Sequence, residues 1–194
     1  MKHLKILVLL GAVLIACSSK KPQMHSIGQI KTDKGEILFW LYDETPRHKE
    51  SFIKLARTNY WDSLTFNRVI PEFVAQGGCP NTKEGFANSP YLLDPEFNDS
   101  LKHVYGAVGA GRDDNPEMRS AGCQFYIVQN KNGLPRLDGK YTVFGKVIKG
   151  MDVVDAIVSV ARDSLDSPLQ PIKLDVIVLE LSLEELRKAG CDVK

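Results

Sequence analysis

The stretch that decides the fold is "FNRVIPEFVAQGG", residues 66–78, in which an arginine and a glutamine interrupt an apolar run. The density of Val, Ile and Phe is typical of a half-buried strand, and Pro71 removes a backbone donor where that strand must turn. Strand alternation predicts that Phe66 and Arg68 lie on one face. Arg68 and Gln76 are unusual in a core strand, because such side chains are rarely buried without a partner. The stretch therefore predicts a sheet surface on which a polar group docks.

The pattern of the remaining sequence predicts many short strands and few helices. Strands are expected at residues 27–30, 36–42, 64–70, 73–76, 104–108, 124–128, 142–147 and 174–181. One amphipathic helix is expected after the N-terminal signal Thr45–Pro46, a second over 150–160, and a short tail helix after the capping-box pattern of Ser182 and Glu185. With 194 residues and 43% apolar composition, this pattern predicts one all-β domain, a closed barrel rather than a sandwich, with two helices capping its ends.

The first residues have the pattern of an export signal. Two lysines precede an unbroken apolar run, residues 6–16, which is shorter than the ~20 residues that a membrane-spanning helix needs. The following "LIAC" resembles the lipobox of bacterial lipoproteins, in which the cysteine, here Cys17, is acylated and becomes the new N-terminus. An ordinary signal peptide cut after Ser18 is the alternative. The expected organisation is a signal peptide at 1–16, lipidated Cys17 and a polar tether at 17–26, the globular domain at 27–181 and a helical tail at 182–194.

This organisation predicts an exported protein that is lipid-anchored to a bacterial membrane, on its periplasmic side or at the cell surface. Removing residues 1–16 leaves 23 Lys and Arg against 24 Asp and Glu, so nothing in the charge favours nucleic acid. The four cysteines, Cys17, Cys79, Cys123 and Cys191, form no C-x-x-C pair and have no histidine at metal-ligand spacing, which argues against zinc. A Cys79–Cys123 disulfide and unpaired burial are both open.

Three histidines lie in the expected mature chain, outside the signal peptide. His25, His48 and His103 lie in polar contexts and have no serine or cysteine partner at a suggestive spacing. We therefore expect them on the solvated surface, and no hydrolase-type catalytic set is predicted.

Three separated segments, in the same order, resemble the cyclophilins, the family of cyclophilin-type peptidyl-prolyl isomerases. They are residues 66–78, "SAGCQFYIV" at 120–128 and "LDGKYTVFGKVIKGMDVVDAI" at 137–157. The resemblance covers approximately residues 27–180 and is weak through 80–103. It implies a closed eight-stranded barrel with two capping helices and a groove on its outer surface for a proline-containing peptide. It also implies an enzyme that needs no cofactor, metal or nucleophile.

Ten residues of this chain match the groove residues of the family. Arg68 matches the catalytic arginine, with Gln76 as a hydrogen-bonding partner of peptide and arginine and Phe73 as the floor of the proline pocket. The implied substrate-binding residues are Phe73, Val74, Gln76, Gly111, Arg112, Gln124, Tyr126, Leu137 and Tyr141. Strand alternation cannot place Phe73 and Gln76 together across Pro71, so that step depends on the family.

This chain departs from the family pattern at three pocket positions. Tyr126 stands where a phenylalanine is usual, Arg136 where a tryptophan is frequent, and Tyr141 where a histidine is frequent. Because that tryptophan helps to bind cyclosporin in family members, we expect weak inhibition by cyclosporin.

The residues suit the implied chemistry. Rotation about an X-Pro bond is opposed by amide resonance, with a barrier of ~20 kcal/mol. A twisted amide has a more basic prolyl nitrogen, to which a fixed guanidinium donates more strongly than to the planar ground state. The expected function is therefore peptidyl-prolyl cis-trans isomerisation that assists the folding of exported proteins. We expect the enzyme to be a monomer whose partners are unfolded or partly folded proline-containing chains. A non-catalytic module of the same fold that holds proline-containing peptides is the alternative.

Overall fold

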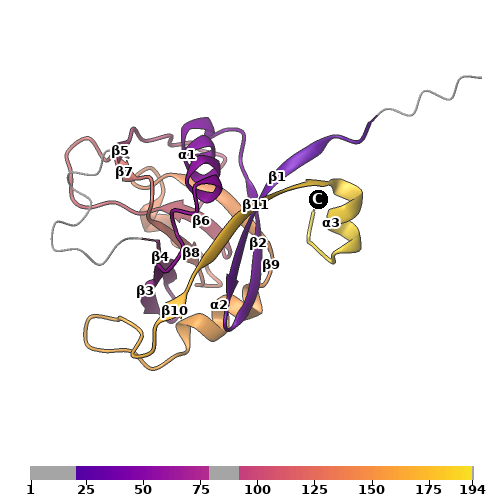
Figure 1. Ribbon diagram of the computed structural model, residues 1–194. Helices are drawn as coiled ribbons and strands as arrows, with labels where there is room; N and C mark the ends of the chain where they lie inside the picture. Colours follow the sequence, from indigo (N-terminus) through magenta and orange to yellow (C-terminus); the bar gives the residue numbers. More distant parts are fainter. Residues whose placement is uncertain (1–20, 79–91, 194) are drawn as a thin grey trace, which may run out of the picture.

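The computed structural model describes residues 21–78 and 92–193 (Figure 1). The predicted signal peptide, the lipidation site Cys17 and the first part of the 80–103 segment lie outside the described residues. Cys79 does too, so its bridge to Cys123 stays a prediction. Within the described ranges, no helix is long and apolar enough to cross a membrane.

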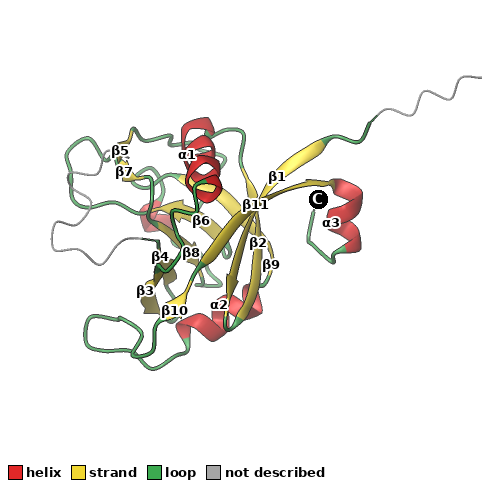
Figure 2. Cartoon of the chain, viewed as in Figure 1, coloured by secondary structure: helices red, strands yellow, loops and turns green. Residues whose placement is uncertain are grey.

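Nine strands of the described chain form one antiparallel sheet, in the order β10-β3-β4-β8-β6-β9-β2-β1-β11 (Figure 2). Their bounds are β1 (Met24–Thr32), β2 (Gly35–Leu41), β3 (Thr65–Ile70), β4 (Val74–Gly77), β6 (Ala107–Ala110), β8 (Phe125–Val128), β9 (Val143–Lys149), β10 (Ile172–Lys173) and β11 (Asp175–Ser182). The edge strands β10 and β11 are separated along the chain by Leu174 alone, whose N–H donates to the carbonyl of Leu64 at 2.8 Å. The two edges of the sheet therefore lie close together, and the barrel is nearly closed.

The predicted all-β barrel is confirmed, with nine strands in place of eight. The additional strand, β10, has two residues, too few for a period-2 pattern to be visible in the sequence. Two further short strands, β5 (Leu92–Leu93) and β7 (Ser120–Ala121), pair with each other in a separate two-stranded sheet. Strand β6 begins three residues later than the expected 104–108 strand.

Two helices cover opposite ends of the barrel, α1 (Pro46–Arg57) and α2 (Met151–Val158) (Figure 1). Helix α1 buries Phe52, whose ring lies 5.1 Å from Phe39 and 4.9 Å from Trp61, measured between centroids. Helix α2 buries four apolar side chains against the same core, Val153, Val154, Ile157 and Val158. The aromatic and branched side chains thus fill the barrel, so a ligand groove must lie outside it.

The predicted tail helix is present as α3 (Leu183–Lys188), on the outside of the barrel beside β11. The Ser182 side chain accepts from the N–H of Glu185 at 3.3 Å, and the Glu185 carboxylate accepts from the N–H of Ser182 at 2.8 Å. This confirms the capping box. Leu186 is buried on the outer face of the sheet, in a small apolar cluster with Ile27, Leu38, Ile148 and Cys191 that is separate from the barrel core.

Candidate active site

A β-bulge in β3 turns Arg68 out of the barrel. Phe66 and Arg68 pair with adjacent residues of β4, so Asn67 is an extra residue in the ladder. Phe66 and Val69 are packed in the barrel core, whereas Arg68 is partly exposed and lines a groove on the outer surface. The prediction that Phe66 and Arg68 share one face is therefore wrong. A bulge adds one residue to a strand and so reverses the alternation beyond it.

The loop that follows α2 holds this bulge from the other edge of β3. The Ser167 hydroxyl donates to the carbonyl of Asn67 at 3.1 Å, and the N–H of Val69 donates to the carbonyl of Asp166 at 2.9 Å. Within the loop, the Asp163 carboxylate accepts from two backbone N–H groups, at 2.8 and 2.9 Å. The backbone on both sides of Arg68 is therefore fixed by a loop about a hundred residues further along the chain.

All ten predicted site residues line one cavity of about 320 Å³ on the outside of the barrel. Three of them form a row across three strands, because Arg68 of β3 pairs with Gln76 of β4, and Gln76 pairs with Tyr126 of β8. The row ends at Gly109 of β6, where an added Cβ would lie 2.3 Å from the Tyr126 ring. Only a glycine leaves room for that ring.

The polar and apolar parts of the groove meet at Arg68. Its Nη1 donates to Oε1 of Gln76 at 3.3 Å, and its guanidinium carbon lies 5.8 Å from the centroid of the Phe73 ring. Phe73 also packs against the apolar cluster that contains Val74, Tyr126, Leu137 and Tyr141. A guanidinium thus stands at the edge of an apolar pocket, which is the combination that the family resemblance implied.

The far wall is formed by Gly111 and Gln124. The N–H of Gly111 donates to the carbonyl of Gln124, and the carbonyl of Gly111 accepts from the N–H of Ala121, both at 2.9 Å. The Gly111 N–H is therefore engaged within the chain, and its carbonyl keeps a second lone pair for a peptide. The buried Oε1 of Gln124 accepts no hydrogen bond from the described residues, so this wall holds one unmet acceptor.

A buried hydrogen-bond chain reaches the pocket from behind. The Asp138 carboxylate lies 2.7 Å from Nδ1 of His103, and Nε2 of His103 lies 2.8 Å from the Tyr126 hydroxyl. Burial lowers the pKa of His103, and although burial alone would raise the pKa of Asp138, hydrogen bonds from His103 lower it. A neutral His103 that donates from Nδ1 to an ionised Asp138 must accept at Nε2. The Tyr126 hydroxyl is then the donor, and burial raises its pKa well above the ordinary value.

His103 is 2% exposed and His48 3%, so the prediction that these histidines are solvated is wrong. Only His25 is partly exposed, with its ring 4.6 Å from that of Trp40. Each buried histidine is paired with a carboxylate that is remote in the sequence. Nothing in the local sequence around a histidine shows such a partner.

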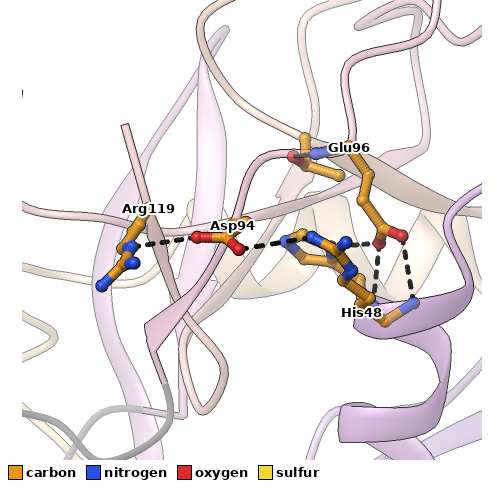
Figure 3. Close-up of polar contacts among 6 residues, drawn as sticks. His48, Asp94, Glu96 and Arg119 are labelled. Atoms are coloured by element: carbon orange, nitrogen blue, oxygen red, sulfur yellow. Dashed lines mark hydrogen bonds and ion pairs between the residues drawn. The ribbon is translucent and has the colours of Figure 1, made fainter. Parts of the chain in front are cut away.

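Figure 3 shows the second pair, in a strap formed by residues 92–97. Glu96 lies 2.6 Å from Nδ1 of His48 and also accepts from the backbone N–H groups of Arg47 and His48 at the start of α1. Burial lowers the pKa of His48. The hydrogen bonds from His48 and Arg47 lower that of Glu96 against the opposing effect of burial. The N–H of Glu96 donates to the buried hydroxyl of Thr142, the residue after Tyr141 of the pocket.

The same strap is tied to the groove wall. Asp94 accepts from Nε of Arg119 at 3.0 Å and lies 3.4 Å from Nη1 of Arg47 (Figure 3). Strand β5 of the strap pairs with β7, whose Ala121 binds the carbonyl of Gly111. The strap therefore joins α1 to the wall at Gly111.

Sequence reasoning missed three residues of this site. Arg136 lines the cavity although it was identified only as a departure from the family pattern. The three-residue 3₁₀-helix η1 (Pro135–Leu137) carries it to the rim, where its guanidinium carbon lies 4.8 Å from the Phe73 ring centroid. His103 and Asp138 were missed because they lie behind the pocket, and the sequence does not show that they are hydrogen-bonded to each other.

Comparison with solved structures identifies the class of fold. A cyclophilin-type peptidyl-prolyl cis-trans isomerase from Cryptosporidium parvum, crystallised in the presence of the dipeptide Ala-Pro, superimposes with a TM-score of 0.70 at 24% sequence identity. The match covers 79% of this chain and 98% of that one. The barrel is therefore a cyclophilin fold.

Sequence comparison then identifies the family. The model of the family "Cyclophilin type peptidyl-prolyl cis-trans isomerase/CLD" matches residues 27–178. The isomerase ppi1 of Schizosaccharomyces pombe is 35% identical over 149 residues, covering 75% of this chain and 94% of the relative. A peptidyl-prolyl cis-trans isomerase of Acinetobacter baylyi is 34% identical over 180 residues, covering 88% and 92%. The chain belongs to the family of cyclophilin-type peptidyl-prolyl cis-trans isomerases.

Proposed function

We propose that this isomerase accelerates X-Pro isomerisation in exported polypeptides, acting as a monomer with Arg68 as its catalytic group. The observation that carries the assignment of Arg68 is the bulge in β3, which places a guanidinium at the edge of an apolar pocket instead of in the barrel core. The proposal of exported substrates is supported by the N-terminal sequence alone. The assignment of the other groove residues to substrate binding is part of the same proposal.

In the proposed mechanism, the pyrrolidine ring enters the apolar pocket at Phe73, Tyr126 and Leu137. Arg68 donates to the prolyl nitrogen as the amide twists, which stabilises the transition state more than the planar ground state. Because Oε1 of Gln76 accepts from Arg68, the Gln76 amide nitrogen is left to donate to a peptide carbonyl. One side of the bond is thereby held while the other rotates.

A module that binds proline segments without turnover is the second candidate. It is favoured by the replacement of an aromatic rim residue by Arg136, which changes how a substrate is held. Magnetisation-exchange NMR of cis/trans interconversion in an Ala-Pro peptide separates the two. Acceleration of exchange by the mature chain supports the enzyme, and line broadening without acceleration supports the holding module.

We further propose that the mature chain is anchored to a bacterial membrane through acylated Cys17. The support is the sequence alone: two lysines, an apolar run and "LIAC" directly before the polar tether. Expression in bacteria with labelled palmitate, followed by fractionation, tests the anchor. We expect label and membrane association in the parent and neither in Cys17→Ser. A soluble, unlabelled parent would contradict the lipid anchor.

A further inference from the structure

Three guanidinium groups line the same groove of about 320 Å³: those of Arg68, Arg112 and Arg136. Only Arg68 is needed for the proposed chemistry. The whole chain is nearly neutral, with 25 Lys and Arg against 24 Asp and Glu, so this concentration of positive charge is local. A local charge of one sign in a groove selects among ligands that compete for it.

The two additional guanidinium groups are held at the groove by aromatic rings of its walls. Arg136 lies over Phe73 with its guanidinium carbon 4.8 Å from the ring centroid, and Arg112 lies over Tyr141 at 4.6 Å. Arg112 also donates to the carbonyls of Lys140 and Asp113, at 3.2 and 2.8 Å. Stacking on aromatic rings holds both cations at the groove walls, and the two hydrogen bonds to carbonyls hold Arg112 further.

No carboxylate of the described residues forms an ion pair with these cations. Within residues 21–78 and 92–193, none of the three arginines forms an ion pair, and Arg136 donates no hydrogen bond. The neighbouring acids are engaged elsewhere or exposed. Asp138 accepts from the backbone and the ring of His103 at 2.9 and 2.7 Å, Asp113 accepts from the Asn115 side chain at 2.9 Å, and Glu72 and Asp114 are exposed.

We propose that the groove selects proline peptides that carry an acidic side chain beside the proline. This rests on the proposed function, since it names the substrate class of the same groove. A carboxylate next to the proline meets guanidinium donors that residues 21–78 and 92–193 leave unmet, and such charge-assisted hydrogen bonds are stronger than neutral ones. A lysine at the same position is repelled.

The test compares peptides that differ only in the residue before or after the proline, with Glu, Ala or Lys at that position. We expect kcat/KM from exchange NMR to be about tenfold higher for the Glu than for the Lys peptide in at least one of the two positions, as charge complementarity acts on association. The ratio should fall between about 0.05 and 0.5 M salt, because exposed charges are screened.

Arginine variants test whether the guanidinium groups of the groove cause the preference for an acidic residue. Arg136→Gln and Arg112→Gln should each lower the Glu/Lys ratio of kcat/KM, whereas Arg136→Lys should retain most of it. Arg57→Gln, at the exposed end of α1, is the matched control that should not change the ratio. Equal kcat/KM for the three peptides, with Ala-Pro turnover intact, would overturn the preference. A ratio unchanged in both Gln variants would overturn the assignment of the preference to the guanidinium groups of Arg112 and Arg136. If no peptide is turned over, the proposed activity fails instead, and the Glu/Lys ratio of dissociation constants then decides the preference.

Discussion

Replacing Tyr126 by phenylalanine removes a single oxygen from the pocket wall and isolates a buried nitrogen. The Tyr126 hydroxyl is the partner of His103 Nε2, at 2.8 Å, and His103 is 2% exposed. Leaving a buried acceptor without a partner costs about 1–3 kcal/mol. In a domain of this size each kcal/mol lowers the melting temperature by about 2–4 °C, so we expect Tyr126→Phe to melt about 2–12 °C below the parent.

Thermal and urea unfolding followed by circular dichroism measure this loss. Tyr141→Phe is the matched control, because the Tyr141 hydroxyl makes no hydrogen bond with the described residues and its ring packs edge-on against Tyr126, at 82°. We expect the control to keep the parent's free energy of unfolding. If Tyr126→Phe is as stable as the parent, the hydrogen bond to His103 contributes nothing and the assignment of His103 as a neutral acceptor is refuted.

Two further predictions concern acid stability and the support of Arg68. Because burial lowers the pKa of His48 and His103 in the folded state, the unfolded chain takes up their protons first as the pH falls through about 6.5. The free energy of unfolding should then fall by at most about 1.4 kcal/mol per pH unit for each histidine, and a urea midpoint that is constant from pH 7.5 to 5 would contradict this. Ser167→Ala should lower kcat about twofold to tenfold with peptide binding unchanged, since it frees the bulge beside Arg68. Ser167→Thr keeps the hydroxyl and should restore kcat. Ser164→Ala, at an exposed position of the same loop, is the control. Equal losses of kcat in both alanine variants would exclude a positioning role for Ser167.

Most of the groove was predictable because eight of its ten predicted residues lie in the three segments that carry the family pattern, 66–78, 120–128 and 137–157, whereas Gly111 and Arg112 lie outside them. Arg68, Phe73 and Gln76 fall within nine residues, and the family pattern fixes their relation across the Pro71 turn. The capping box of α3 was predictable for a related reason, since both partners lie within one helical turn.

The features that sequence reasoning missed depend on contacts between distant parts of the chain. The bulge at Asn67 is set by pairing with β4 and by Ser167, a hundred residues away. His48 and His103 are buried because their carboxylates, 48 and 35 residues away, replace water. Strands β5, β7 and β10 have two residues each, too few for hydrophobic periodicity to reveal.

The most direct test of the catalytic claim is the rate of Ala-Pro exchange at saturating peptide for the parent, Arg68→Ala and Arg68→Lys. A circular dichroism spectrum and a peptide titration establish that each variant folds and binds. We expect Arg68→Ala to lose about 10²-fold in exchange rate, the loss typical of one missing donor to a transition state. Arg68→Lys should lose nearly as much, because an ammonium lacks the planar guanidinium geometry. An Arg68→Ala variant that binds the peptide and keeps the parent's exchange rate would contradict the assignment of Arg68 as the catalytic group.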